Sequence, residues 1–168
     1  MMPAYPFQFI GLNTVGADTY LKDTLVYAFK SEKSGHHYQV NIERYIEHLC
    51  GVKFFDQTTD VRSGKFSQLS GTYEPRTIFG TVADIALDAY QRDPQSSFFF
   101  IGAADSRDRS SVTTHRHRVY TAFVNDLHLD NLFRIVEVKD LSMTVLVNRK
   151  AVPDMDVFMK RILSFVMG

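Results

Sequence analysis

Residues 96–104 read Ser-Ser-Phe-Phe-Phe-Ile-Gly-Ala-Ala, and the organisation of the chain is best followed outward from them. Four consecutive apolar residues, Phe98 to Ile101, leave no polar side. Strands of this composition are typical of a sheet that is covered on both faces. We therefore predict a central strand over 96–101, after which Gly102 releases the chain into the polar run 105–111.

Apolar residues recur every three or four positions on both sides of this strand, which is the spacing of an amphipathic helix. Before the strand, the repeat predicts a helix from about Thr77 to Gln91, because Pro94 disfavours helix at the residue before it. After the strand, it predicts a helix from about Thr113 to Leu127. The two apolar faces consist of Ile78, Val82, Ile85, Ala86 and Ala89, and of Val119, Tyr120, Phe123, Val124 and Leu127.

The C-terminal part predicts two strands and a last helix. The strands are expected over Phe133 to Val138 and Met143 to Asn148. The helix is expected over 155–166, with Asp154 and Asp156 at the end where the helix dipole favours negative charge. Its apolar face consists of Met155, Phe158, Met159, Ile162, Leu163 and Val166.

The N-terminal part alternates between apolar and polar residues, as half-buried strands do. Alternation over 25–29 and 38–42, separated by turn residues 31–35, predicts a hairpin. Residues 43–49 fit either a helix or a strand, and 52–55 suggest a returning strand. A loop over 56–64 and a short strand around Lys65 to Leu69 complete this part.

These elements predict one α+β domain over residues 1–168, an α/β sandwich. Its mixed, largely antiparallel sheet starts as an N-terminal strand meander, and the second half runs helix, strand, helix, strand, strand, helix. A helix between two extended segments is a crossover unit, and the apolar strand needs cover on both faces.

Charge and cysteine content limit the classes of partner and compartment. The 168 residues contain 19 Lys and Arg against 19 Asp and Glu, so the net charge is zero, which argues against duplex DNA or an anionic membrane as the main partner. Little charge would repel a second copy, so a homodimer is compatible with the composition. Cys50 is the single cysteine and excludes an internal disulfide. With no apolar run of membrane-spanning length and no N-terminal signal pattern, we expect a cytoplasmic protein.

The polar run after the central strand is the candidate ligand site. Ligands of open α/β sheets gather where strands end, and helix N-termini present free N–H groups to anions. A small anionic ligand or an unknown protein is the expected partner. The alternative is a solvated loop whose Asp and Arg residues pair with each other. The candidate residues are Gly102, Asp105, Arg107, Arg109, His115, Arg116 and Arg118.

Other catalytic patterns are missing from the sequence. His115 and His117, two apart on a helix, point in different directions, and neither a Cys pair nor a His-Glu-x-x-His run is present, so no metal site is expected. No Gly-x-Ser-x-Gly elbow and no glycine-rich phosphate loop occurs, and Cys50 is expected to be buried. Asp84 and Asp88 share one helix face, where paired acids more often form the wet side.

The motifs Phe-Phe-Phe-Ile-Gly-Ala at 98–103 and Arg-His-Arg-Val-Tyr at 116–120 resemble those of small Bacteroidetes-type bacterial proteins of unknown function. The resemblance extends to Thr-Val-Ala at 81–83 and Leu-Val-Asn-Arg-Lys at 146–150 and so spans most of the chain. It implies no activity.

The second half alone also resembles the C-terminal part of the GNAT acyltransferase superfamily, with a helix, an apolar strand, a polar loop, a helix with a central aromatic residue, and strands. That resemblance implies that Arg76 and Gly80, in Arg-Thr-Ile-Phe-Gly-Thr, help bind the phosphates of acetyl-CoA. It also implies that Tyr120 is the catalytic acid.

Three functions follow from these observations. The first is a binding or interaction protein with a GNAT-like core, without catalysis and without a cofactor, that uses the 105–118 region. The second is a coenzyme A-dependent N-acyltransferase. The third is a nucleic-acid-binding module, disfavoured by the zero net charge, that would use Arg107, Arg109, Arg116, Arg118 and Lys139.

Overall fold

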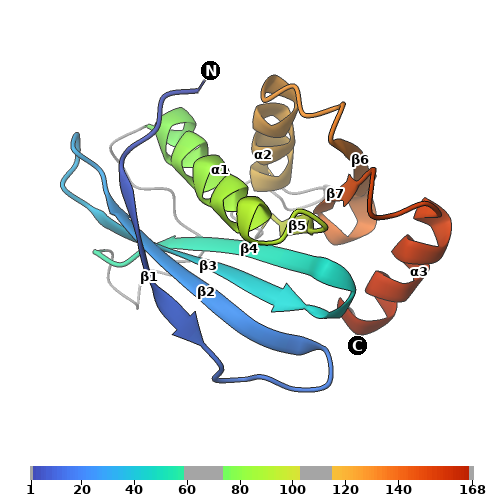
Figure 1. Ribbon diagram of the computed structural model, residues 1–168. Coiled ribbons are helices and arrows are strands. Elements are labelled where there is room, and N and C mark those ends of the chain that lie inside the picture. Colours follow the sequence, from blue (N-terminus) through green and yellow to red (C-terminus); the bar gives the residue numbers. More distant parts are fainter. Residues whose placement is uncertain (1, 59–73, 103–114, 167–168) are drawn as a thin grey trace.

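A seven-stranded mixed sheet forms the centre of the protein, in a computed structural model that describes residues 2–58, 74–102 and 115–166 (Figure 1). The strand order is β1-β2-β3-β4-β5-β7-β6. Every neighbouring pair is antiparallel except β4 with β5, which run parallel. The strands are β1 (Phe7–Asn13), β2 (Leu21–Lys30), β3 (His37–Tyr45), β4 (Leu49–Asp56), β5 (Ser97–Ile101), β6 (Phe133–Val138) and β7 (Met143–Asn148).

The first four strands form an antiparallel meander. In the β2–β3 hairpin, Leu25 lies opposite Ile42 and Tyr27 opposite Val40, so the predicted alternation places these buried residues on one face. The hairpin prediction is confirmed. β1 was not predicted, because Gly11 and a bulge between Phe9 and Gly11 interrupt its alternation. The strand expected at 65–69 lies outside the described residues.

The connection between β3 and β4 resolves the ambiguity of residues 43–49. β3 continues to Tyr45, a single 3-10 turn covers Ile46–His48, and β4 begins at Leu49. Glu47 and His48 have φ angles of 65° and 55°, a left-handed conformation that turns the chain sharply without glycine. The helical spacing at 42–49 therefore comes from two strands joined by a tight turn.

Three α-helices cover the sheet: α1 (Pro75–Arg92), α2 (His115–Asp126) and α3 (Met155–Val166). The three predicted helices are confirmed, and the bounds of α1 agree with the prediction within two residues. The predicted start of the second helix at Thr113 lies outside the described residues. α1 begins with Pro75 in its first turn, where the missing N–H has no intrahelical partner to lose. Its buried face packs over β2 and β3 through residues such as Ile85 and Val82.

α1 and α2 lie on one face of the sheet and α3 on the other (Figure 1). Successive residues of β5 pack on opposite faces of the sheet. Phe98 belongs to the cluster with α1 and α2, and Phe99 packs with Phe158 and Ile162 of α3. The prediction that β5 is covered on both faces is confirmed, as is the α+β class with a mostly antiparallel sheet.

Among the helices of the described segments, none combines the length and the apolar character that crossing a bilayer requires.

The N-terminal segment crosses α1 at Gly80. A Cβ atom at this glycine would lie 2.1 Å from the Pro3 carbonyl oxygen, so the close approach depends on the missing side chain. The backbone N–H of Tyr5 donates to Thr81 Oγ1 at 2.8 Å, and Met2 is buried beside the helix. The absence of a side chain at Gly80 therefore lets segment 2–5 pack directly against the helix.

We predict that Gly80→Ala destabilises the protein by about 1–3 kcal/mol, because the new methyl group forces the Pro3 carbonyl away. In an ordinary helix the same change stabilises by about 1 kcal/mol. Urea unfolding measures both effects, with Ala122→Gly at an exposed α2 position as the measure of ordinary helix propensity. A Gly80→Ala variant that is more stable than the parent would contradict the contact.

Candidate functional site

The two parallel strands at the centre of the sheet separate soon after they meet. β4 and β5 pair only at Leu49–Ser97, Cys50–Phe98 and Gly51–Phe99, although β4 continues to Asp56. At Gly51 the Phe99 ring packs so close that a Cβ would lie 2.8 Å from it. The separation leaves a space on the side of the sheet that α1 and α2 cover.

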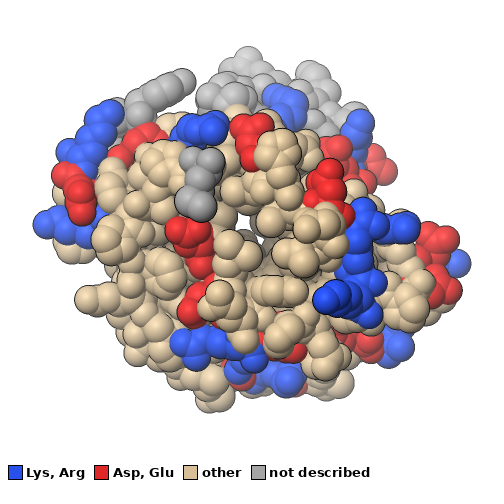
Figure 2. Space-filling view, turned by 45° about the horizontal axis from the view of Figure 1, so that its top comes forward, with Lys and Arg blue, Asp and Glu red and all other residues tan. Residues whose placement is uncertain are grey.

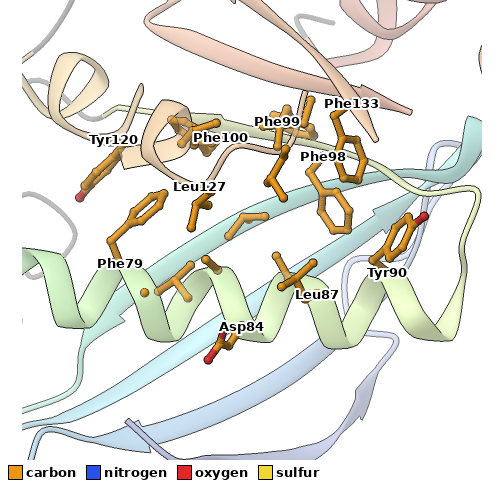
Figure 3. Close-up of a pocket in the computed structure, with 18 of the residues that line it drawn as sticks. Phe79, Asp84, Leu87, Tyr90, Phe98, Phe99, Phe100, Tyr120, Leu127 and Phe133 are labelled. Carbon is orange, nitrogen blue, oxygen red and sulfur yellow. The ribbon is translucent and has the colours of Figure 1, made fainter. Parts of the chain in front are cut away.

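A cavity of about 560 Å³ occupies this space, between α1, α2, β4 and β5. In Figure 3, Phe79 and Leu87 of α1 project toward Phe98 and Phe100 of β5, and Leu127 projects in from the end of α2. Almost all the lining side chains are apolar or aromatic. They include Met2, Val52, Phe54, Phe79, Val82, Ala83, Ala86, Leu87, Tyr90, Phe98, Phe99, Phe100, Ile101, Tyr120, Val124, Leu127, Leu129, Phe133 and Leu146.

Charged groups stand at the margins of the cavity. Figure 2 shows the molecule hollowed near the centre of that view, with uncharged residues immediately around the opening. Arg76 and Asp126 form a bridge of 3.4 Å between α1 and α2, and both side chains are 54% exposed, so solvent weakens the pair. Asp84 belongs to the cavity lining, but its side chain points away from the aromatic residues in Figure 3.

Tyr120 lies in the cavity wall. Its ring contacts those of Phe54, Phe79 and Phe100, with centroids 5.7, 6.0 and 6.0 Å away. The side chain is buried. The sequence placed Tyr120 on the apolar stripe of its helix, and the structure adds that this stripe faces the cavity.

The predicted anion site is described only in part. Gly102 is buried at the end of β5, where its N–H donates to the Ser142 carbonyl at 2.9 Å. Arg118 is exposed on α2. His115 and Arg116 lie in the first turn of α2. Asp105, Arg107 and Arg109 lie outside the described residues, and Lys139, named for nucleic-acid binding, is exposed in the turn between β6 and β7.

Arg76 and Gly80, implied as phosphate ligands by the acyltransferase resemblance, lie on the first two turns of α1. The Pro3 carbonyl occupies the approach to Gly80. Glu74, immediately before the helix, is buried and accepts hydrogen bonds from the hydroxyls of Tyr5 and Ser31. A carboxylate and a carbonyl at this end of α1 disfavour a phosphate at Gly80 itself, because both repel an anion.

A buried polar network that the sequence did not reveal attaches α2 to the sheet. His117 is fully buried, with Nε2 3.2 Å from Glu137 Oε1 and Nδ1 3.4 Å from Thr144 Oγ1. Thr144 Oγ1 lies 2.9 Å from Thr121 Oγ1. His117 and Thr121 are one turn apart on α2, so one side of the helix is fixed to β6 and β7 while Tyr120 faces the cavity.

The other candidate reactive groups are either protonated or already hydrogen-bonded within the protein. Cys50 is buried as predicted, and burial raises the pKa of its thiol to about 11, so it stays protonated near neutrality. Asp88 accepts a hydrogen bond from the Tyr27 hydroxyl at 2.6 Å, which lowers the pKa of that carboxyl. Within the described segments, no group of three or more His, Cys, Asp or Glu side chains is arranged to hold a metal ion.

The chain has no match among protein-family models, curated proteins or solved structures.

We predict that His117→Ala lowers the free energy of unfolding by about 2–4 kcal/mol, since it leaves a cavity and removes two hydrogen bonds. Glu137→Gln is the matched control. Its side chain is 40% exposed and the amide oxygen still accepts, so the cost should stay below about 1 kcal/mol. Equal costs for the two variants, measured by urea unfolding, would mean that the histidine contributes no more than its exposed partner.

Proposed function

We propose that the protein binds a small molecule with an extended, largely apolar body in the cavity between α1, α2, β4 and β5. The proposal rests on the separation of β4 from β5 after Gly51. This separation opens a cavity that apolar and aromatic side chains line. A packed protein interior normally leaves few voids larger than a water molecule. A space of this size, left unfilled by the side chains of the described residues, therefore suits a ligand.

The size and walls of the cavity define the chemistry of the ligand. About 560 Å³ lies within the range of about 300–1,000 Å³ that small-molecule sites occupy. Each Å² of apolar ligand surface that leaves water gains about 25 cal/mol, so an alkyl or aromatic body supplies most of the binding free energy. The exposed apolar residues Leu87 and Ile101, both in the lining, extend this surface toward solvent.

The edge of β4 adds a polar strip to these apolar walls. Val52, Lys53 and Phe54 are consecutive residues of the lining, so the strand contacts the cavity along its backbone. The described segments pair β4 beyond Gly51 with β3. Amide groups of the ligand would hydrogen-bond to the backbone of residues 52–54 where this stretch lines the cavity.

We predict that Ala83→Phe fills the cavity and weakens ligand binding at least about tenfold, while stability changes by less than about 1.5 kcal/mol. The probes are anilinonaphthalene sulfonate, read by fluorescence, and an N-alkyl acetamide that competes with it. The matched control is Ala122→Phe, because Ala122 is exposed on α2 and outside the lining. No saturable binding by the parent, or equal binding by Ala83→Phe, would refute this assignment.

The second candidate is a coenzyme A-dependent N-acyltransferase. Two observations favour it: Tyr120 lies in the cavity wall, and α1, β5, α2, β6 and β7 follow one another as in the acyltransferase resemblance. An acyl thioester with its amide-bearing arm suits the part of β4 that lines the cavity. In the transfer, the amine nitrogen bonds to the acyl carbon, the carbon–sulfur bond breaks, and the Tyr120 hydroxyl gives its proton to the thiolate. The proton that the amine nitrogen loses passes through solvent to the tyrosinate and restores the hydroxyl. The phosphates would bind near Arg76 but away from Gly80.

We predict for this candidate that acetyl-CoA raises the Tm of the parent and of Tyr120→Phe but not of Ala83→Phe. The hydroxyl acts only in proton transfer, so Tyr120→Phe should release thiol from acetyl-CoA, with benzylamine as acceptor, about 100-fold more slowly. A flat thermal response of the parent would remove this candidate and leave the binding function standing.

A further inference from the structure

We propose that β1 pairs with β1 of a second copy, antiparallel and about a twofold axis near Ile10, and joins two sheets into one. β1 is the end strand of the sheet and pairs only with β2 in the described segments. An end strand presents a row of N–H and C=O groups that another strand can bind. This inference is independent of the cavity and of the proposed function.

The side chains of β1 lack the features that normally protect a sheet edge. Residues 2–17 contain no charged residue. Phe9, Ile10 and Leu12 are 41%, 59% and 53% exposed, and Val15, in the turn that follows, is 82% exposed. Soluble proteins usually protect such strands with lysine, proline, inward-pointing charges or a bulge, and of these β1 has the bulge alone.

The opposite edge of the same sheet is protected. β6 carries the exposed residues Arg134 and Glu137, and Lys139 and Asp140 follow it directly. The two edges thus differ in the property that decides whether edges associate. β6 carries charged side chains and β1 itself carries none, so β1 is the edge suited to a partner strand. The charge nearest to β1 is that of Arg92 from α1, which lies 4.2 Å from the centroid of the Phe9 ring.

The pattern of charge at the ends of β1 favours a second copy in antiparallel orientation. Exposed Lys30 lies beside the start of β1, while exposed Asp18 and Lys22 lie beyond its end and offset each other. Antiparallel pairing therefore sets each Lys30 toward an end where the charges of Asp18 and Lys22 cancel, whereas parallel pairing would place Lys30 beside Lys30. The zero net charge of the chain adds no long-range repulsion between copies.

The bulge between Phe9 and Gly11 leaves Ile10 without a partner residue in β2. Its side chain is the most exposed apolar group within the strand. On a twofold axis near this position, the two Ile10 side chains would cover each other.

The test is the mass of the whole chain in sedimentation equilibrium over about 1–200 µM, the range in which small interfaces associate. The parent should change from monomer to dimer with rising concentration. Ile10→Lys should raise the dissociation constant at least about tenfold, because the pair would bring two lysines together. Val157→Lys, at a 52% exposed site on α3, should leave it unchanged.

A cross-linking measurement tests the same contact without relying on the folding of Ile10→Lys. Ile10→Cys should form an intermolecular disulfide on mild oxidation, and Val157→Cys should not; the buried Cys50 does not compete. A parent that stays monomeric throughout the range overturns the proposal, as does a dimer that persists in Ile10→Lys or fails to cross-link through Ile10→Cys.

Discussion

The short pairing between the two parallel strands controls the interior of this protein. β4 and β5 share three residue pairs and then separate, with Phe99 packed directly on Gly51 at the last of them. A side chain at Gly51 would move Phe99, which also belongs to the cluster beneath α3. The position of one ring thus connects the layer on the α3 side with the cavity on the other side.

Much of the fold could be predicted from periodicity. The three helices were found because their buried faces follow a three-to-four-residue repeat. The strands at 133–138 and 143–148 were also predicted correctly, although β7 is buried at all six positions and shows no such repeat. β1 was missed because its bulge and Gly11 break that repeat. The turn at Glu47 and His48 was ambiguous because two strands joined by left-handed residues imitate helical spacing.

The site could be predicted less well, because a cavity is a property of packing and not of a local pattern. Tyr120 was assigned to the apolar face of its helix and Phe100 to the apolar run of its strand, whereas Phe79 was not singled out; all three are largely enclosed. What no pattern contains is that their rings surround a cavity of about 560 Å³. The signal that pointed closest was the run of aromatic residues that ends β5. The partners of the buried His117 are 20 and 27 residues away in sequence, beyond any local motif.

The contact between Tyr5 and Thr81 has a consequence for synthesis of the chain. The two residues are 76 positions apart, so on the ribosome the first leaves the exit tunnel well before the second has been translated. During that interval Met2 and Tyr5 have no helix to pack against, and the apolar segment 2–5 is exposed to other nascent chains or to chaperones. Gly80 then allows segment 2–5 to dock after the helix has formed, because no side chain at position 80 blocks the contact.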